Sequence, residues 1–384
     1  IWWSVLARAS ISTLDEIEAL ASTDHQINIS KELLDQINSF SSKSQNATSA
    51  LTNLITCLIC HATDGRIDPR FHRQPSNEMP PPPSGNDHWF SGRTISEKII
   101  YPWLSKNDYR TAKSGWQTRT FERPRPYTLN YPENIAFLKQ EFLFILDQVS
   151  TGKVASKDVL VQLIRLEKII KRDRAVLQKA VAKNKIGNRI LISDLIGLFE
   201  KHFSLPNSSI LPVYAMYAVY QLLILEVKQY SRFKLKKLDA HESSDQRTGS
   251  IGDIELVDQD GDVVEALEIK HGFPIDLVIV LKAKEKIEKS KVKRYYILTT
   301  HDNHGVIDEA IQKIIESVYR NHGCQIIVNG LISTMKYYLR LLSQPSEVVN
   351  TYSLLIASQR SIKYDQIEHW STLIRAISRT YNEG

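Results

Sequence analysis

The sequence predicts an α/β protein whose N-terminal region is mostly helical. Up to about residue 205, apolar residues recur at helical spacing. After Pro212, short strand-like runs alternate with helical segments, which is typical of an α/β layer. The 384 residues, 42% of them hydrophobic, are enough for two or three packed domains. We therefore expect a helical region over residues 1–205 and an α/β domain over 206–384.

In the N-terminal region we expect several helices and one proline-rich linker. Residues 12–63 carry helical periodicity in pieces. The segment 69–85 includes four consecutive prolines, which cannot sustain a helix or a central strand. A short helix over 95–104 is expected to end at Pro102. Longer helices are predicted at about 134–149, 156–183 and 190–203.

The C-terminal domain is expected to begin with the most apolar stretch of the chain, residues 210–225. Its 16 residues fall short of the ~20 that span a bilayer, so we interpret it as a buried helix. Two short alternating runs joined by a turn follow. The remaining elements are a helix at 274–290, the strand KRYYILTT, a helix at 306–321, the strand CQIIVNG and a helix at 331–343.

Composition sets limits on compartment and partners. The net charge of +6 is too small to argue for nucleic acid by itself. Three cysteines and an N-terminus that reads as a trimmed fragment rather than a signal peptide favour the cytoplasm. The pair Cys57 and Cys60 lies in an apolar helical run, which indicates buried structural cysteines. No glycine-rich phosphate loop is found, so we expect no nucleotide cofactor. Because the most apolar stretch is too short to span a bilayer, we also expect no membrane association.

The most informative segment is a hairpin over residues 249–272. Asp260-Gly261 is typical of a two-residue type I′ turn. In that register Asp253 faces Glu268, and directly opposed residues lie ~4.5–5.5 Å apart on one face of the sheet. Lys270 shares this face because side chains alternate. Two carboxylates and a lysine are thus expected together at the open end of the hairpin.

This grouping has the chemistry of a magnesium site. Two adjacent carboxylates repel each other unless a cation lies between them, and Mg²⁺ accepts few protein oxygens together with water and phosphate. A neighbouring lysine can orient or deprotonate a water, or neutralise charge on a phosphate. The alternative is an exposed hairpin with an ordinary salt bridge.

The spacing of Asp253, then fourteen residues, then Glu268-Ile269-Lys270 resembles the PD-(D/E)XK nuclease signature. The resemblance covers about residues 208–345, and the wider segments RTGSIGDIE and EALEIKHG are similar to type II restriction endonucleases of the SacI-like group. It implies that Asp253 and Glu268 bind metal and that Lys270 assists the attacking water. It also implies a mixed sheet between helices.

Further acids are candidates for the same metal site. Glu226 lies near the end of the apolar helix, where the resemblance places an additional acid, although a solvated helix end is the simpler interpretation. Glu255 shares the face of Asp253 and could serve a second metal, hold Lys270 or be exposed. His271 is expected to point to the opposite face from Lys270.

A basic and aromatic segment between Lys106 and Arg125 has the composition of a DNA-contacting loop. The best candidates for DNA contacts, there and just before the hairpin, are Gln117, Arg119, Arg123, Arg125, Arg247, Thr248 and Ser250. A solvated basic surface remains the alternative.

The expected function is that of a type II restriction endonuclease, a site-specific deoxyribonuclease that hydrolyses double-stranded DNA with Mg²⁺. Cutting both strands of a palindromic site favours a homodimer. Either the helical region or the tail from Val348, with Trp370 and Leu373, could supply the interface. A nuclease of DNA repair or RNA processing, or a DNA-binding module without catalysis, remains open.

Overall fold

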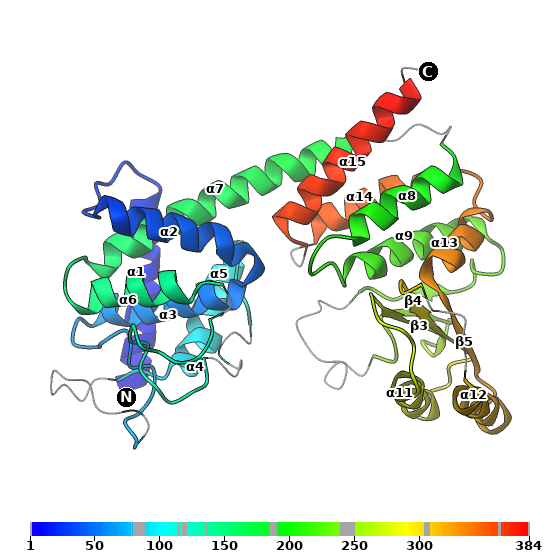
Figure 1. Ribbon diagram of the computed structural model, residues 1–384, viewed down its shortest axis with the longest axis horizontal. Coiled ribbons are helices and arrows are strands. Elements are labelled where there is room, and N and C mark those ends of the chain that lie inside the picture. Colours follow the sequence, from blue (N-terminus) through cyan, green and yellow to red (C-terminus); the bar gives the residue numbers. More distant parts are fainter. Residues whose placement is uncertain are drawn as a thin grey trace. The chain divides into compact units, whose positions relative to one another are not determined.

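The chain folds into two compact units, residues 1–175 and 176–384. We describe them from a computed structural model (Figure 1). The boundary falls inside one long helix rather than near residue 205, so the helix that follows it belongs to the second unit. The structure describes residues 2–77, 79, 89–113, 116, 121–135, 137–183, 190–238, 250–302, 308–359 and 362–382.

Helices make up the regular structure described in the first unit. They are α1 (Trp2–Ala21), α2 (Lys31–Lys43), the 3₁₀ turn η1 (Ser44–Asn46), α3 (Thr48–Thr63), α4 (Gly92–Ile95), the π-helical turn η2 (Ser96–Ile100), α5 (Tyr101–Lys106), α6 (Lys139–Ser150) and the start of α7 (Ser156–Lys183). Their apolar faces form one core around α3, on which Leu51, Leu54 and Leu58 are fully buried. Cys57 and Cys60 are buried there as free thiols, as expected.

The expected helix stop at Pro102 is wrong. Helix α4, the π-helical turn and α5 follow one another without a break to Lys106. The amide of Tyr101 donates to the carbonyl of Ser96, five residues back. Pro102 then follows directly after the π-helical turn, in the first residues of α5.

The proline-rich and basic segments contribute to the core of the first unit. Residues 69–77 and 79 form no helix or strand, yet Phe71 and Met79 are buried, so this part of the expected linker packs within the unit. The remainder of 69–85 lies outside the described residues. In the basic segment, Tyr109, Trp116 and Phe121 are buried in the same core rather than offered to a ligand.

The second unit contains a five-stranded sheet and eight helical segments among its described residues. The strands are β1 (Lys234–Leu235), β2 (Ile254–Val257), β3 (Val263–Lys270), β4 (Arg294–Thr299) and β5 (Gln325–Gly330). The helices, besides the end of α7, are α8 (Ile192–Phe203), α9 (Leu211–Glu226), α11 (Leu277–Glu288), α12 (Glu309–His322), α13 (Leu331–Leu339), α14 (Glu347–Ser358) and α15 (Tyr364–Asn382). Most of these match the expected segments, and the α/β fold class is confirmed.

The sheet is mixed, with strand order β1-β2-β3-β4-β5. β1, β2 and β3 are antiparallel neighbours, whereas β3, β4 and β5 are parallel and joined through α11 and α12. Both helices begin at an aspartate N-cap, because Asp276 and Asp308 each accept a hydrogen bond from the amide three residues later. The last residues of β3, β4 and β5 are paired with one another, so the three parallel strands end at the same end of the sheet.

Each face of the sheet is covered by helices (Figure 1). On one face, Ile254, Leu267 and Ile269 pack into the core that includes α8, α9 and α13 to α15. On the other face, Ala266 and Tyr295 pack against α11 and α12. The side-chain alternation expected for the hairpin is therefore confirmed.

The turn of the hairpin differs from the expected type I′ turn. Gly261 has a positive φ of 85°, but Asp260 is not among the residues with positive φ. The Asp258 side chain accepts hydrogen bonds from the amides of Asp260 and Asp262, which builds a longer loop. A bulge between Leu256 and Val257 accompanies a one-residue shift in register, because Val257 pairs with Val263 instead of Val264. Deeper in the hairpin the expected register holds.

The tail helices α14 and α15 belong to the core of the second unit. Trp370 is fully buried and its indole N–H donates to Ser353 at 2.8 Å. That side chain is therefore part of the core, contrary to the expectation that it could face a second subunit. Within the described helices, none has both the length and the apolar character to cross a membrane.

Candidate functional site

Asp253 lies directly before β2, beside the last residues of β3. Its Oδ2 accepts a hydrogen bond from the backbone amide of Ile269 at 2.7 Å. Ile254 pairs with Leu267, which continues the register that sets Asp253 opposite Glu268. The preceding Gly252 permits this approach, because a Cβ there would lie 2.6 Å from the carbonyl oxygen of Leu267. The close strand contact thus aims the carboxylate at the end of β3.

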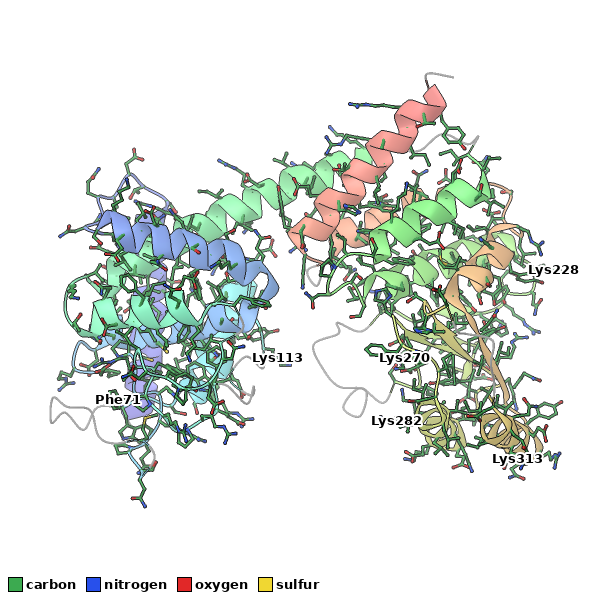
Figure 2. The ribbon with its side chains drawn as sticks, viewed as in Figure 1. Phe71, Lys113, Lys228, Lys270, Lys282 and Lys313 are labelled. Atoms are coloured by element: carbon green, nitrogen blue, oxygen red, sulfur yellow. The ribbon has the colours of Figure 1, made fainter. Side chains whose placement is uncertain are left out.

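Glu268 is the centre of a charged cluster on the α11 face of the sheet. Its Oε1 lies 2.5 Å from Nζ of Lys270, and its Oε2 lies 3.0 Å from Nζ of Lys286 on α11. The Tyr295 hydroxyl donates to the carbonyl of Ile251 at 2.9 Å and lies 3.3 Å from the same Oε2. Figure 2 labels Lys270 at the end of β3 and Lys282 on the neighbouring helix α11. Glu268 and Lys270 are therefore in contact, and Asp253 is bonded to the amide of Ile269, the residue between them.

The donor set suits a hard divalent cation. The strand register sets Asp253 opposite Glu268 at the hairpin end, and each oxygen of Glu268 contacts an ammonium group. Among the described parts of the chain, no three His, Cys, Asp or Glu side chains are grouped to hold a metal ion. From the described residues, an ion at this point would have at most these two carboxylates as acidic ligands. Mg²⁺ commonly binds in this way, with water and phosphate oxygens completing its shell.

Glu255 has a structural environment distinct from that of Glu268. It is 3% exposed and accepts hydrogen bonds from Lys236 at 2.7 Å, from the Ser250 hydroxyl and from the amides of Ile251 and Gly252. Burial alone would raise the pKa of Glu255, but these donors hold the pKa below its ordinary value. Of the alternatives for Glu255, exposure is wrong because the side chain is buried, and its ion pair is with Lys236 rather than Lys270. Glu255 thus fixes the turn that precedes Asp253.

Glu226 lies away from the hairpin end. It is exposed at the end of α9, where its Oε2 accepts hydrogen bonds from the amide and hydroxyl of Ser343. Lys228, two residues later, is labelled well apart from Lys270 in Figure 2. The structure thus does not bring Glu226 to the Asp253–Glu268 pair.

His271 points to the face opposite Lys270, as expected. Its Nε2 lies 3.0 Å from the Ser208 hydroxyl and its Nδ1 lies 2.8 Å from the Thr300 hydroxyl. Burial lowers the pKa of His271, which favours the neutral imidazole. A cavity of about 440 Å³ adjoins it at the ends of β3, β4 and β5.

The candidate DNA contacts divide into described and undescribed residues. Arg123 and Arg125 are exposed, and Arg123 lies 3.7 Å from Glu133. The Ser250 hydroxyl donates within the turn, to Gly252 and Glu255, so its contacts are local. Four candidates lie outside the described residues: Gln117, Arg119, Arg247 and Thr248.

Sequence patterns do not identify two residues of the site, Lys286 and Tyr295. Lys286 belongs to the run KAKEK, in which several lysines alternate with other residues and periodicity does not single out the one that faces β3. Tyr295 lies on β4, and its approach to Glu268 requires the parallel pairing of β3 with β4. The sequence signal for Tyr295 was a pair of adjacent tyrosines in an apolar strand, of which one must face each side of the sheet.

Comparison of the sequence with models of known protein families and with curated proteins finds no match in either case.

Proposed function

We propose that the protein is a Mg²⁺-dependent endonuclease with a PD-(D/E)XK-like core, acting on double-stranded DNA as a type II restriction enzyme. The observation that supports this most is the contact of Lys270 with Glu268 at the open end of the β2–β3 hairpin, where Asp253 is bonded to the amide of Ile269. The mixed sheet between two helical layers agrees with that core. A homodimer follows from the proposed cutting of both strands.

In this proposal each residue has a separate role. Asp253 and Glu268 would hold the metal ion. When bound, Mg²⁺ supplies charge stabilisation at a phosphate and a more acidic water. Lys270, whose side chain is 33% exposed, is able to reach solvent while it contacts Glu268. Its ammonium group can orient a water or donate to a phosphate oxygen as negative charge develops.

Cleavage of plasmid DNA tests the proposal. We expect Mg²⁺ to support cutting into discrete fragments, and Lys270→Met and Asp253→Asn each to reduce the rate at least ~100-fold, which is the lower range for a positioned proton-transfer group. Lys291→Met is the matched control, because Lys291 pairs with exposed Asp262 at the other end of the hairpin.

Other outcomes would contradict parts of the proposal. A smear of fragments would indicate a less specific nuclease, such as one that acts in DNA repair, rather than a restriction enzyme. Absence of cleavage with Mg²⁺ and Mn²⁺ would overturn catalysis and leave the Lys270–Glu268 pair as a structural salt bridge.

A further inference from the structure

We propose that Lys286 is a positioning residue that acts as a resident cation of the site and weakens its affinity for a divalent ion. The inference rests on the proposed function, since it assigns a role toward the metal held by Asp253 and Glu268. It starts from the contact between Lys286 and Oε2 of Glu268 at 3.0 Å.

The charges explain why this lysine matters. Glu268 and Asp253, which the strand register sets opposite it, contribute two negative charges, and Lys270 and Lys286 contribute two positive charges at Glu268. A site with one lysine would keep a net negative charge and attract a divalent ion more strongly. Because Lys286 makes the cluster neutral, an ion must compete with an ammonium group for Oε2.

The placement of Lys286 supports competition rather than a purely structural contact. Its side chain is 25% exposed, so the ammonium group can withdraw toward water when an ion arrives. Glu268 would then still have Lys270 and the neighbouring Tyr295. Repulsion between a unit charge and a divalent ion ~5 Å away, in water-like surroundings, changes a binding constant by roughly one power of ten.

Titration of the free protein with Mn²⁺, followed by electron paramagnetic resonance of the unbound ion, tests the inference without DNA. We expect Lys286→Met to bind Mn²⁺ about tenfold more tightly than the wild type. Lys286→Gln, which loses the charge but keeps a hydrogen-bond donor, should show the same gain. Lys286→Arg should stay at the wild-type affinity.

Lys284→Met is the matched control, because Lys284 lies on the same helix but pairs with Glu288 at 3.7 Å. It should leave Mn²⁺ affinity within twofold of the wild type. A second readout is the melting temperature, which Mn²⁺ should raise more in Lys286→Met than in the wild type.

The inference is overturned if Lys286→Met and Lys286→Gln bind Mn²⁺ no more tightly than the wild type, or if no variant binds it. It is equally overturned if Lys284→Met gains as much affinity. The proposed function fails separately, since plasmid cleavage can be absent while the gain in Mn²⁺ affinity at Lys286 is still observed.

Discussion

The ion pair between Glu265 and Arg294 offers a test of how the sheet is stabilised. Glu265 on β3 is fully buried, and it accepts hydrogen bonds from Arg294 at 2.7 Å and from Tyr220 at 2.6 Å. Arg294→Met removes the only cation that the structure places on this carboxylate among the described residues. The variant would therefore leave a charged group in an apolar core.

The expected cost follows from these contacts. Removing one partner of a buried pair destabilises a protein by about 3–5 kcal/mol. We expect a value near the lower end, about 3 kcal/mol, because Tyr220 still donates to Glu265 and the Arg294 side chain is 33% exposed. Replacing both partners, in Glu265→Leu with Arg294→Met, should cost less than the single change because no charge stays buried.

Urea unfolding with hydrogen exchange of β3 and β4 peptides measures this cost within the second unit. A cost below 1 kcal/mol, or a double variant as unstable as the single one, would refute the reasoning.

Three further predictions concern the turn before Asp253 and the buried thiols. Gly252→Ala should lower the unfolding free energy by about 1–3 kcal/mol, because its Cβ would lie 2.6 Å from a backbone oxygen. The control is Gly197→Ala in α8, whose Cβ would meet no atom within 4 Å and which should be stabilising. Thermal melting compares the two variants. Glu255→Gln should cost about 2 kcal/mol at pH 7. Folding lowers the pKa of Glu255, so its stabilisation is present above the unfolded-state pKa and is lost as the pH falls. Urea unfolding at pH 3 should therefore show a smaller difference in unfolding free energy between variant and wild type than at pH 7. An equal difference at the two pH values would contradict this prediction. Burial raises the pKa of Cys324 to about 12 and also raises those of Cys57 and Cys60, so a thiol reagent at pH 8 should react only after unfolding; rapid labelling of the native protein would contradict the described core.

Local patterns predicted the elements better than their connections. Helix α7 has the expected bounds, 156–183, because one apolar stripe and a run of charges define it completely. The pairing of Glu255 with Ala266 is also as expected, since hydrophobic alternation fixes the register. Strand β1 was not expected, because two residues carry no periodic signal.

In the candidate site too, residues close in the sequence could be predicted, whereas those brought together by tertiary packing could not. Asp253, Glu268 and Lys270 could be grouped from the sequence because they belong to one hairpin. The partner of Glu255 could not, since Lys236 comes from β1-flanking residues whose pairing is decided by tertiary packing. Side chains from α11 and β4 join the site through the crossover connection, whose geometry no local pattern specifies.

The mixed order of the sheet has a consequence for how the site forms during folding. The side chains that the structure shows in contact with Glu268, those of Lys270, Lys286 and Tyr295, belong to one continuous stretch, from β3 through α11 to β4. The chain segments to be closed are short, so their loop entropy is small compared with that of pairing distant parts of the chain. We therefore expect the charged cluster to assemble early, with the β2–β3 hairpin, and to require α8, α9 and the tail helices for stability rather than for geometry.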